Sequence, residues 1–273
     1  MNPVTLLFKP TIIPLAEMNL IPGATDDLAE WVENYRPECL PVDEVYTGAD
    51  LFPHDGTEDG RTLTGNELLV ELSGRNCYMS YGLKAGRKTN RDYIAHSQSG
   101  TVPHRSIMYH AKMTFFIAGI SRRVSHELIR HYVGADRTEE GSPSQESTRY
   151  TFHPGHFVVP PRMVEAGGDA VVKFSEDMSK AYAAYRDYLR GEIRDHTEAH
   201  GSEPKGLDRK RIYEAASGLL PMQAATSFIW TANPVSLAKM FVERTDSTSD
   251  VEFQRLAVAW KAICESRWPN LFH

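Results

Sequence analysis

A long helical pattern constrains the fold of this chain more than any other feature. From Asp169 to about His200, apolar side chains recur with a helical period. The residues of this stripe are Val172, Phe174, Met178, Ala181, Tyr182, Tyr185 and Leu189. The pattern predicts one amphipathic helix of roughly 30 residues, which is about 45 Å long. The fold therefore has to accommodate at least one helix of that length.

Strand patterns lie on both sides of this helix in the sequence. Residues 107–117 show a mixed alternation, and residues 223–232 carry Phe228, Ile229 and Trp230 in their middle. Shorter helices are predicted for residues 26–35, 64–81, 90–97, 210–219, 234–244 and 250–267. Strands mixed with long helices predict an α+β fold, with a mixed sheet.

We expect residues 1–273 to form a single domain, in which residues 1–62 are a divergent N-terminal elaboration. This segment is rich in Pro, Gly and Asp in places, and it predicts an opening strand, one short helix and irregular loops. Thr64 is placed to cap the helix that follows. The residues expected on the inward face of that helix are Leu68, Leu69, Leu72 and Cys77.

The balance of charge argues against one class of partner. The chain has 36 acidic and 30 basic side chains, for a formal net charge of −6. Sequence-independent binding to DNA or RNA needs a basic surface, so we expect no nucleic-acid partner. No apolar run approaches the ~18 residues of a membrane span, and the N-terminus lacks the features of a signal peptide. We therefore expect a cytoplasmic protein that does not associate with a membrane.

The cysteines support the same compartment. Cys39, Cys77 and Cys264 are widely spaced and form no CxxC pattern, so we expect neither a disulfide framework nor a metal site. A reducing cytoplasm is the simplest setting for such a chain. Cys77 and Cys264 have apolar helical neighbours, which favours structural roles. None of the three cysteines is placed like a catalytic nucleophile.

The stretch from residue 119 to residue 150 combines a helical pattern with a polar loop. Ile120, Val124 and Leu128 recur at helical spacing over residues 119–132 and are expected to be buried. A neighbouring stripe carries Arg123, Glu127, Arg130 and His131, whose spacing allows their side chains to touch. The loop then offers Ser142, Ser144, Gln145, Ser147 and Arg149. Such groups suit a phosphorylated polar ligand, because an arginine can grip a phosphate with two N–H groups. The alternative is a salt-bridged helix face followed by a solvated loop.

This stretch resembles the signature of the flavin-dependent thymidylate synthases. In that family Arg-His-Arg is followed after seven residues by Ser-x-Arg, usually with a Tyr next. Arg130 and His131 match the first part, and residues 147–150 match the second. Fourteen residues separate the two parts here, so the loop is about seven residues longer, with the insertion expected within residues 134–140. The resemblance covers about residues 65–270 and includes residues 72–78, 119–131, 220–221, 233 and 241–244.

The resemblance implies a homotetramer with active sites at the subunit interfaces. It implies flavin contacts for His104, Ser106, Arg130, His131, Tyr132, Asn233 and Lys239. It implies substrate contacts for Glu127, Gln145, Ser147, Thr148, Arg149, Lys210 and Arg244. Arg244 matches the arginine that polarises the uracil ring, and it is the implied catalytic residue. Without the family, Lys210 and Lys239 are equally well explained as solvated lysines on helices.

Several positions depart from the family pattern. Tyr132 replaces the third residue of Arg-His-Arg, and Tyr109 replaces a glutamate. Ser217 and Val235 replace arginines, and Thr248 replaces a common histidine. We therefore expect a site that is retuned relative to the family.

The implied reaction is C5-methylation of a uridine 5′-monophosphate. Methylenetetrahydrofolate (the 5,10-methylene form) would supply the carbon, reduced FAD the hydride, and NADPH would re-reduce the flavin. One version is the ordinary conversion of dUMP to dTMP. The other accepts UMP, like the related C5-methylase of polyoxin-type nucleoside antibiotic pathways, and the longer loop and lost arginines favour it. A third alternative is a flavin- or nucleotide-binding protein without catalysis. The retained residues His104, Arg130, His131, Arg149 and Arg244 argue against it.

Overall fold

The computed structural model describes residues 4–35, 47–81, 89–99, 101, 103–131 and 142–272. Its strands are β1 (Thr5–Leu7), β2 (Thr11–Glu17), β3 (Thr57–Glu58), β4 (Arg61–Thr62), β5 (Met113–Ser121), β6 (Ser142–Gln145), β7 (His156–Val158) and β8 (Ala225–Ala232). Its α-helices are α1 (Ala24–Tyr35), α2 (Gly65–Tyr78), α3 (Asn90–Gln98), α4 (Arg122–Leu128), α5 (Pro161–Ala166), α6 (Gly168–His200), α7 (Gly206–Ser217), α8 (Pro234–Arg244) and α9 (Val251–Arg267). Short 3₁₀ turns are η2 (Gly48–Leu51), η4 (Arg105–His110) and η5 (Ile129–His131). Cys39, Tyr132 and the expected insertion at residues 134–140 lie outside the described residues.

The α+β class is confirmed. Antiparallel and parallel strand pairs belong to different sheets. The main sheet has the strand order β2-β5-β8-β6, and every neighbouring pair in it is antiparallel. The parallel pair is a separate one, β1 with β7, and a short antiparallel hairpin joins β3 to β4. In place of the expected mixed sheet, the structure has an antiparallel sheet and a separate parallel pair of strands. An isolated bridge between Phe157 of β7 and Ala224, just before β8, connects the two.

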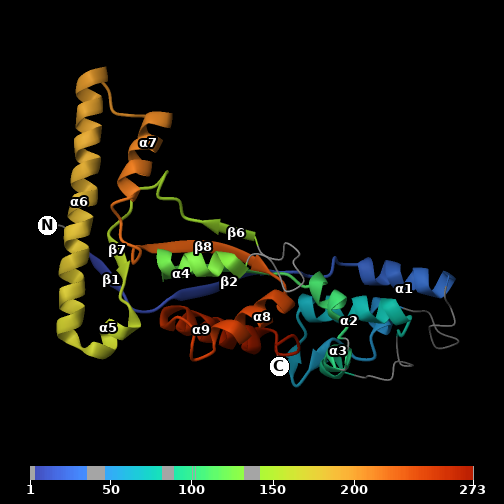
Figure 1. The fold of residues 1–273 in the computed structure, drawn as a ribbon. Helices are drawn as coiled ribbons and strands as arrows, with labels where there is room; N and C mark the ends of the chain where they lie inside the picture. Colours follow the sequence, from blue (N-terminus) through green and yellow to red (C-terminus); the bar gives the residue numbers. More distant parts are fainter. Residues whose placement is uncertain are drawn as a thin grey trace.

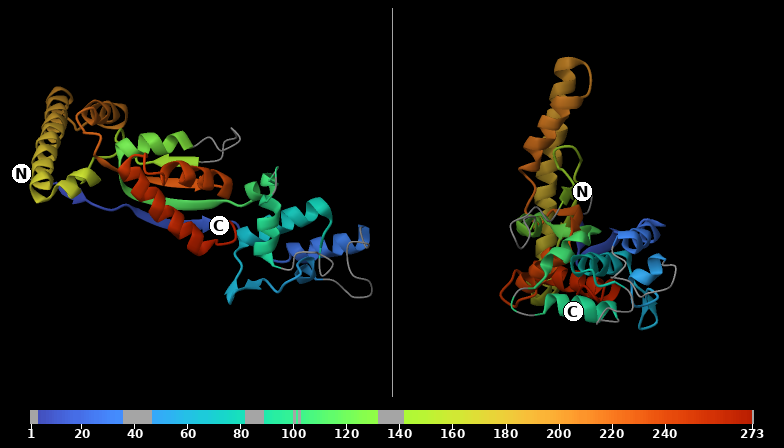
Figure 2. Two further views of the ribbon diagram at one scale, coloured as in Figure 1. Left: turned by 60° about the horizontal axis from the view of Figure 1, so that its bottom comes forward. Right: turned by 90° about the vertical axis from the view of Figure 1, so that its right-hand side faces the viewer.

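The molecule is elongated, with the sheet in the middle (Figure 1). Helices α6 and α7 stand at one end, and α1, α2 and α3 gather at the other, an arrangement that Figure 2 shows again from two further sides. The main core lies between the sheet and helices α4, α8 and α9, where Phe115, Trp230 and Trp260 are fully buried. A second apolar cluster joins α6 and α7 to β7, and a third lies between α1 and α2. No described helix is long and apolar enough to cross a membrane.

A bulge at Gly119 shapes the start of the site. Gly119 has φ of +69°, and the register of β5 against β8 shifts between Ala118 and Ile120. A Cβ here would lie 3.2 Å from the carbonyl oxygen of Lys9, so both the backbone conformation and the space favour glycine. The strand then continues to Ser121, whose side chain accepts a hydrogen bond from Val124 N and caps α4. The predicted helix at residues 119–132 is therefore shorter, and it ends in the 3₁₀ turn η5.

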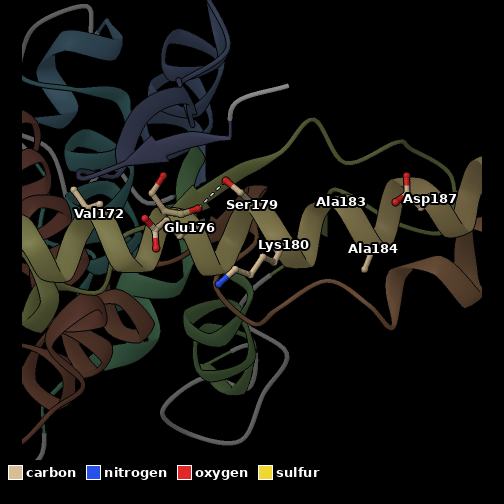
Figure 3. Close-up of a pocket in the computed structure, with 8 residues that line it drawn as sticks. Val172, Glu176, Ser179, Lys180, Ala183, Ala184 and Asp187 are labelled. Carbon is tan, nitrogen blue, oxygen red and sulfur yellow. Dashed lines mark hydrogen bonds between the residues drawn. The ribbon is translucent and has the colours of Figure 1, made fainter. Parts of the chain in front are cut away.

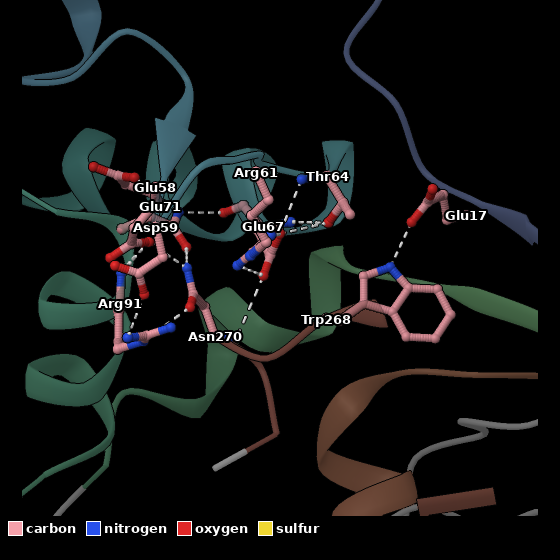
Figure 4. A network of polar contacts seen from close by, with 11 residues as sticks. Glu17, Glu58, Asp59, Arg61, Thr64, Glu67, Glu71, Arg91, Trp268 and Asn270 are labelled. Carbon is pink, nitrogen blue, oxygen red and sulfur yellow. Dashed lines mark hydrogen bonds and ion pairs between the residues drawn. The ribbon is translucent and has the colours of Figure 1, made fainter. Parts of the chain in front are cut away.

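Helix α2 buries a polar face, contrary to the expectation from its leucines. Its buried residues are Asn66, Glu67, Val70, Glu71, Gly74 and Arg75, whereas Leu68, Leu69 and Leu72 are half-buried and Cys77 is exposed. Ion pairs explain this reversal. Glu67 accepts two hydrogen bonds of 2.8 Å from Arg61, and Glu71 accepts one of 2.7 Å from Arg75. Figure 4 shows the polar network that these acids form with the neighbouring elements.

Candidate active site

The last turn of α8 places Arg244 among side chains from three other elements. Its Nε donates a hydrogen bond to Nε2 of His131 at 2.9 Å, and its Nη1 donates to Oε2 of Glu127 at 2.8 Å. The guanidinium carbon lies 4.7 Å from the centre of the Phe253 ring, in a cation–π contact. One fifth of the Arg244 side chain is exposed, so a ligand can reach N–H groups that these contacts leave.

His131 is neutral at pH 7. Burial and the neighbouring charge of Arg244 lower the pKa of His131 to about 4. Because Nε2 accepts the hydrogen bond from Arg244, the single proton of the neutral ring is on Nδ1. Nδ1 lies 3.7 Å from the carboxylate of Glu243, and the ring meets Phe253 edge-on. A neutral histidine can therefore fix the direction of the guanidinium without adding a second positive charge.

The protonation state of His131 can be measured. An NMR titration of the wild-type protein should show His131 neutral down to about pH 5 and half-protonated near pH 4. Replacing Arg244 with alanine removes the second-largest cause of the lowering and leaves burial in place, so the pKa should rise but stay below about 6.5. A wild-type His131 that becomes charged above pH 6 would contradict the neutral state.

Arg123 connects this cluster to the start of α9. Its Nη2 donates to Oε2 of Glu252 at 3.1 Å, it pairs with Asp250, and its Nη1 lies 4.0 Å from Glu127. Glu252 in turn accepts hydrogen bonds of 2.8 Å from the amide and the hydroxyl of Ser121. Burial alone would raise the pKa of Asp250, but the hydrogen bond and charge of Arg123 together with the backbone hydrogen bonds at Phe253 and Glu252 outweigh it, and the pKa is lowered. The start of α4 is thereby fixed to the start of α9, which carries Phe253.

A pocket of about 510 Å³ opens beside the cluster, and Glu243 belongs to both. Its polar lining consists of Gln98, Arg105, Lys239 and Glu243. Its apolar lining consists of Met108, Pro234, Val235, Ala238, Val242 and Leu271. Lys239 lies 3.8 Å from Glu243 and is about half exposed. An apolar surface next to cationic side chains suits a flat ring system that carries phosphate groups.

Two of the residues expected to bind flavin each have a buried polar atom with no hydrogen-bond partner among the described residues. One is Nδ1 of His104, which precedes η4, the turn that carries Arg105 and Met108. The other is Nδ2 of Asn233, whose Oδ1 caps α8 by accepting from Ser236 N at 2.9 Å. Buried polar groups are rarely left unpaired, so both atoms fit a bound polar ligand such as a flavin.

The other expected cofactor residues have simple positions. Ser106 is exposed on η4, next to the pocket residue Arg105. Arg130 is exposed on η5, one residue before His131. Tyr132 lies outside the described residues. Of the described part of the expected flavin set, Lys239 lines the pocket and His131 contacts Arg244. His104, Ser106 and Asn233 directly adjoin pocket-lining residues in the sequence, and Arg130 adjoins His131.

The residues expected to bind a substrate phosphate form a second group. Residues 147–150 make a turn, in which Tyr150 N donates to the carbonyl of Ser147 at 3.1 Å and Arg149 N donates to the Ser147 hydroxyl at 3.3 Å. This turn contacts α7, because Arg149 pairs with Glu214 at 3.3 Å and Lys210 lies over the Tyr150 ring. Arg149 is about half exposed, so its guanidinium remains accessible to an anion.

Gln145 and Thr148 differ in how they are engaged. Gln145 on β6 donates to the hydroxyls of Ser125 at 3.0 Å and Thr226 at 3.2 Å. Its amide therefore stabilises the junction between β6, α4 and β8 in this state. Thr148 is half-buried within the turn.

The two groups lie apart in one chain. Figure 1 shows α7 beside α6 at one end of the molecule, whereas α8 lies with α9 along the sheet, and Figure 2 agrees. The structure thus brings Glu127 and His131 to Arg244, and it brings Lys210 to the Tyr150 ring in the turn that contains Ser147 and Arg149. It does not bring these two sets of residues together within a single chain.

Some residues of the site were missed from the sequence. Phe253 was not expected in the site because an apolar residue on an amphipathic helix is usually explained by the core. Asp250 and Glu252 have the acidic side chains that a neighbouring arginine attracts, but their pairing with Arg123 spans 127 and 129 residues. Among the residues around Arg244, only Glu243 could have been noticed from its place in the sequence, because it directly precedes Arg244.

The four described positions that depart from the family pattern differ in burial and in hydrogen bonding. Val235 is half-buried in the pocket, and the Tyr109 hydroxyl is buried without a partner among the described residues. The Ser217 hydroxyl donates to the carbonyl of Glu214 at 2.7 Å, within its own helix. The Thr248 hydroxyl pairs with Asp246 on the surface. Ser217 and Val235 therefore provide no cation at positions where the family has one.

Cysteine and metal chemistry have no site in the described part of the chain. No group of three or more His, Cys, Asp or Glu side chains there is arranged to hold a metal ion. Burial raises the pKa of the Cys264 thiol well above its ordinary value, which suppresses the reactive thiolate. Cys77 is exposed on α2, and the residues around Arg244 include neither of these cysteines.

The fold and the arginine cluster agree with a comparison to known families. Residues 61–270 match the Thy1 family, described as thymidylate synthase complementing protein. The chain belongs to this family. The match begins at β4 and ends at Asn270, so it includes the Arg244 cluster, the pocket-lining residues other than Leu271 and the turn at residues 147–150.

Curated relatives support the assignment, and a solved structure has a similar fold. The chain is 33% identical over 200 residues to a flavin-dependent thymidylate synthase of Mycobacterium sp. (strain KMS), covering 71% of this chain and 74% of the relative. It is 34% identical over 212 residues to the flavin-dependent thymidylate synthase of Mycobacteroides abscessus, covering 76% and 79%. The fold resembles the crystal structure of the UMP/dUMP methylase PolB from Streptomyces cacaoi bound with 5-Br dUMP. That likeness has a TM-score of 0.59 at 16% identity and covers 98% of this chain and 95% of the other.

Proposed function

We propose that the protein is a flavin-dependent methylase that adds a methyl group to C5 of a uridine 5′-monophosphate. The observation that carries this proposal is Arg244, held by Glu127 and His131 over the Phe253 ring, beside a pocket. Membership in the Thy1 family and relatives named flavin-dependent thymidylate synthases support the same reaction class. The carbon donor in this proposal is 5,10-methylenetetrahydrofolate.

Arg244 is the proposed catalytic residue. C5 of uracil is a poor nucleophile, so the reaction needs a group that stabilises negative charge developing in the ring. Arg244 would hydrogen-bond a uracil carbonyl through the N–H groups that Glu127 and His131 leave. A cation held in place before the reaction costs no reorganisation when that charge appears. His131 contributes by orienting the guanidinium while remaining neutral.

The chain supplies binding and orientation for the cofactor. When bound, flavin supplies the hydride, and we assign its re-reduction to NADPH. The proposed flavin-binding residues are His104, Ser106, Arg130, His131, Tyr132, Asn233 and Lys239. Asn233 has a double role, since its Oδ1 caps α8 and its Nδ2 is available to the ligand. The proposed substrate-binding residues besides Arg244 are Glu127, Gln145, Ser147, Thr148, Arg149 and Lys210.

We propose that the substrate pocket accepts ribose as well as deoxyribose. Ser217, on the helix α7 that also carries Lys210, has a short side chain at a position where the family has arginine. The Ser217 hydroxyl is engaged with its own helix, so no rigid fork projects from that position. A pocket with more room and fewer fixed cations tolerates a 2′-hydroxyl, at some cost in affinity.

We propose a homotetramer with active sites at subunit interfaces. Its support is the separation of the Arg244 cluster from the turn at Arg149, because a substrate that contacts both needs a second copy of the chain. A long helix face is also left uncovered. Figure 3 shows it on α6, where a groove of about 750 Å³ is lined from Val172 to Asp187. Small residues on this face, among them Ser179 and Ala183, would allow a neighbouring helix to approach closely.

The reaction is tested with FAD-loaded protein and two nucleotides. The purified protein should bind FAD without a covalent bond and turn yellow. With oxygen excluded, its reduced flavin should be oxidised only when methylenetetrahydrofolate and a nucleotide are both present. Mass spectrometry should then find a C5-methyl product from dUMP and from UMP. Product from dUMP alone would restrict the activity to dTMP synthesis, and a protein that cannot take up FAD would overturn the proposed function.

A further inference from the structure

The C-terminal segment Trp268–Phe272 contacts two parts of the molecule at once. Asn270 reaches into the buried polar network of α2, α3 and β3 (Figure 4). Leu271, the next residue, belongs to the main core and lines the pocket beside Arg244. Phe272 packs against Phe241 of α8 with a ring separation of 6.1 Å. The segment therefore lies between the polar network and the candidate flavin pocket.

Asn270 is fully buried, and its polar atoms are paired in a way that only an amide satisfies. Its Nδ2 donates to Oε2 of Glu58 at 2.7 Å and to Oδ1 of Asn90 at 2.9 Å. Its Oδ1 accepts from Nε of Arg91 at 3.3 Å, and its backbone N–H donates to Oε1 of Glu67 at 3.3 Å. A carboxylate in this position would face Glu58 and the amide oxygen of Asn90 without the two side-chain N–H donors that they require, whereas the backbone N–H to Glu67 would remain.

The polar network extends beyond the contacts of Asn270. Asn90 donates to the carbonyl of Glu67 at 2.9 Å and to Oε2 of Glu71 at 2.8 Å, and His54 lies 2.8 Å from the same Oε2. His54 thus belongs to the network without touching Asn270. A substitution at His54 can therefore weaken the network without changing a direct contact of the C-terminal segment.

We infer that the segment Trp268–Phe272 supplies one wall residue of the cofactor pocket, Leu271, and that Asn270 is the residue that positions it. This inference rests on the proposed function, because it takes the occupant of the pocket to be the flavin. The N-terminal hairpin β3–β4 contributes Glu58 to the site of Asn270, although it lies far from the pocket in the sequence. The hairpin thereby sets the position of Leu271 through one buried amide. Asn270 acts as a positioning residue and does not touch the reacting atoms.

The substitution Asn270→Asp tests this inference with almost no change in size. We expect the Kd for FAD to rise about tenfold, which corresponds to about 1.4 kcal/mol of binding free energy. The Kd is measured by quenching of flavin fluorescence on titration with apoprotein. The matched control is His54→Gln, which perturbs the same network at Glu71 and should lower the melting temperature without changing FAD affinity. In the double variant Glu58→Gln/Asn270→Asp, the amide introduced on β3 can donate to the carboxylate introduced in the C-terminal segment, and part of the affinity should return.

The outcomes separate this inference from the proposed function. Wild-type protein that does not bind FAD would overturn both. Wild-type protein that binds FAD, together with an Asn270→Asp variant of unchanged affinity, would overturn only the role of the C-terminal segment. An equal loss of affinity in His54→Gln would also overturn it, because general destabilisation would then explain the result. If Asn270→Asp does not fold, Leu271→Ala alters the pocket wall directly, and unchanged FAD affinity in that variant would reject the inference.

Discussion

Replacing Arg244 with alanine should lower the rate of methylation by about a hundredfold to a thousandfold while FAD remains bound. Removing one preorganised donor to developing negative charge typically costs on the order of 3–4 kcal/mol of transition-state stabilisation. The site of Arg244 fits such a donor, since two hydrogen bonds and the Phe253 ring hold the guanidinium in one orientation. The measurement is single-turnover oxidation of the reduced flavin with saturating nucleotide and folate.

Two further variants decide how this loss is interpreted. Arg244→Lys keeps the charge but cannot pair with Glu127 and His131 in the same geometry, so we expect only a small recovery of rate. Arg255→Ala removes an arginine of α9 that pairs with Glu165 on the surface, and it should leave the rate unchanged. Turnover of Arg244→Ala within a few-fold of wild type would remove Arg244 from the catalytic role. Its melting temperature must be compared as well, because Glu127 loses a partner in that variant.

The elements with strong local signals were predicted almost to their ends. Helix α8 has the predicted bounds, and β8 differs by two residues at its start. Both α8 and α9 have side-chain caps, Asn233 and Asp250, that are visible in the sequence. The helix expected at residues 119–132 was too long. Ile120, Val124 and Leu128 are buried whether Ile120 belongs to the helix or to the preceding strand, so their pattern does not locate the start of the helix. The bulge at Gly119 lets the strand run on to Ser121, and that bulge depends on the pairing of β5 with β8.

The candidate site shows the same limit at longer range. The approach of Arg123 to Glu127 follows from their spacing on one helix, and the structure has them 4.0 Å apart. The pairing of Glu127 and His131 with Arg244 spans 117 and 113 residues, and no local pattern contains it. Only the family resemblance brought these residues into one hypothesis. Their contacts with Phe253 and the contribution of Leu271 to the pocket come from tertiary packing, so they were found only in the structure.

The polar face of α2 is the clearest failure of the sequence pattern, and it leads to a strong prediction about stability. Glu71 and Arg75 have fully buried side chains, and Arg75 also donates to the carbonyl of Ser80 and lies over the Tyr93 ring. Burial alone would raise the pKa of Glu71, but His54 and Arg75 outweigh it and lower that pKa. Arg75 is on the same helix as Glu71, but His54 and Asn90 reach Glu71 from other segments, and helix periodicity alone does not contain those contacts.

Replacing Arg75 with methionine should therefore reduce the free energy of unfolding by about 3–5 kcal/mol at pH 7, because a buried carboxylate loses its cation. In the wild type, the lowered pKa of Glu71 gives stability that is present above the pKa of the unfolded state and is lost as pH falls through the folded value. In the variant, the pKa of Glu71 should rise, so protonation relieves the buried charge and the difference from wild type should narrow at acidic pH. Urea unfolding at about pH 7 and pH 5 measures both effects.

The double variant Glu71→Gln/Arg75→Met isolates the charge. It removes the unpaired carboxylate, so it should be more stable than Arg75→Met alone, and the two substitutions should not be additive. The matched surface control is Arg190→Met on α6, where Arg190 is 65% exposed and lies 3.8 Å from Asp187. This control should leave unfolding unchanged within error, because exposed ion pairs contribute little. An Arg75→Met protein as stable as this control, or a double variant no more stable than Arg75→Met, would show that the buried pair does not hold the polar face of α2.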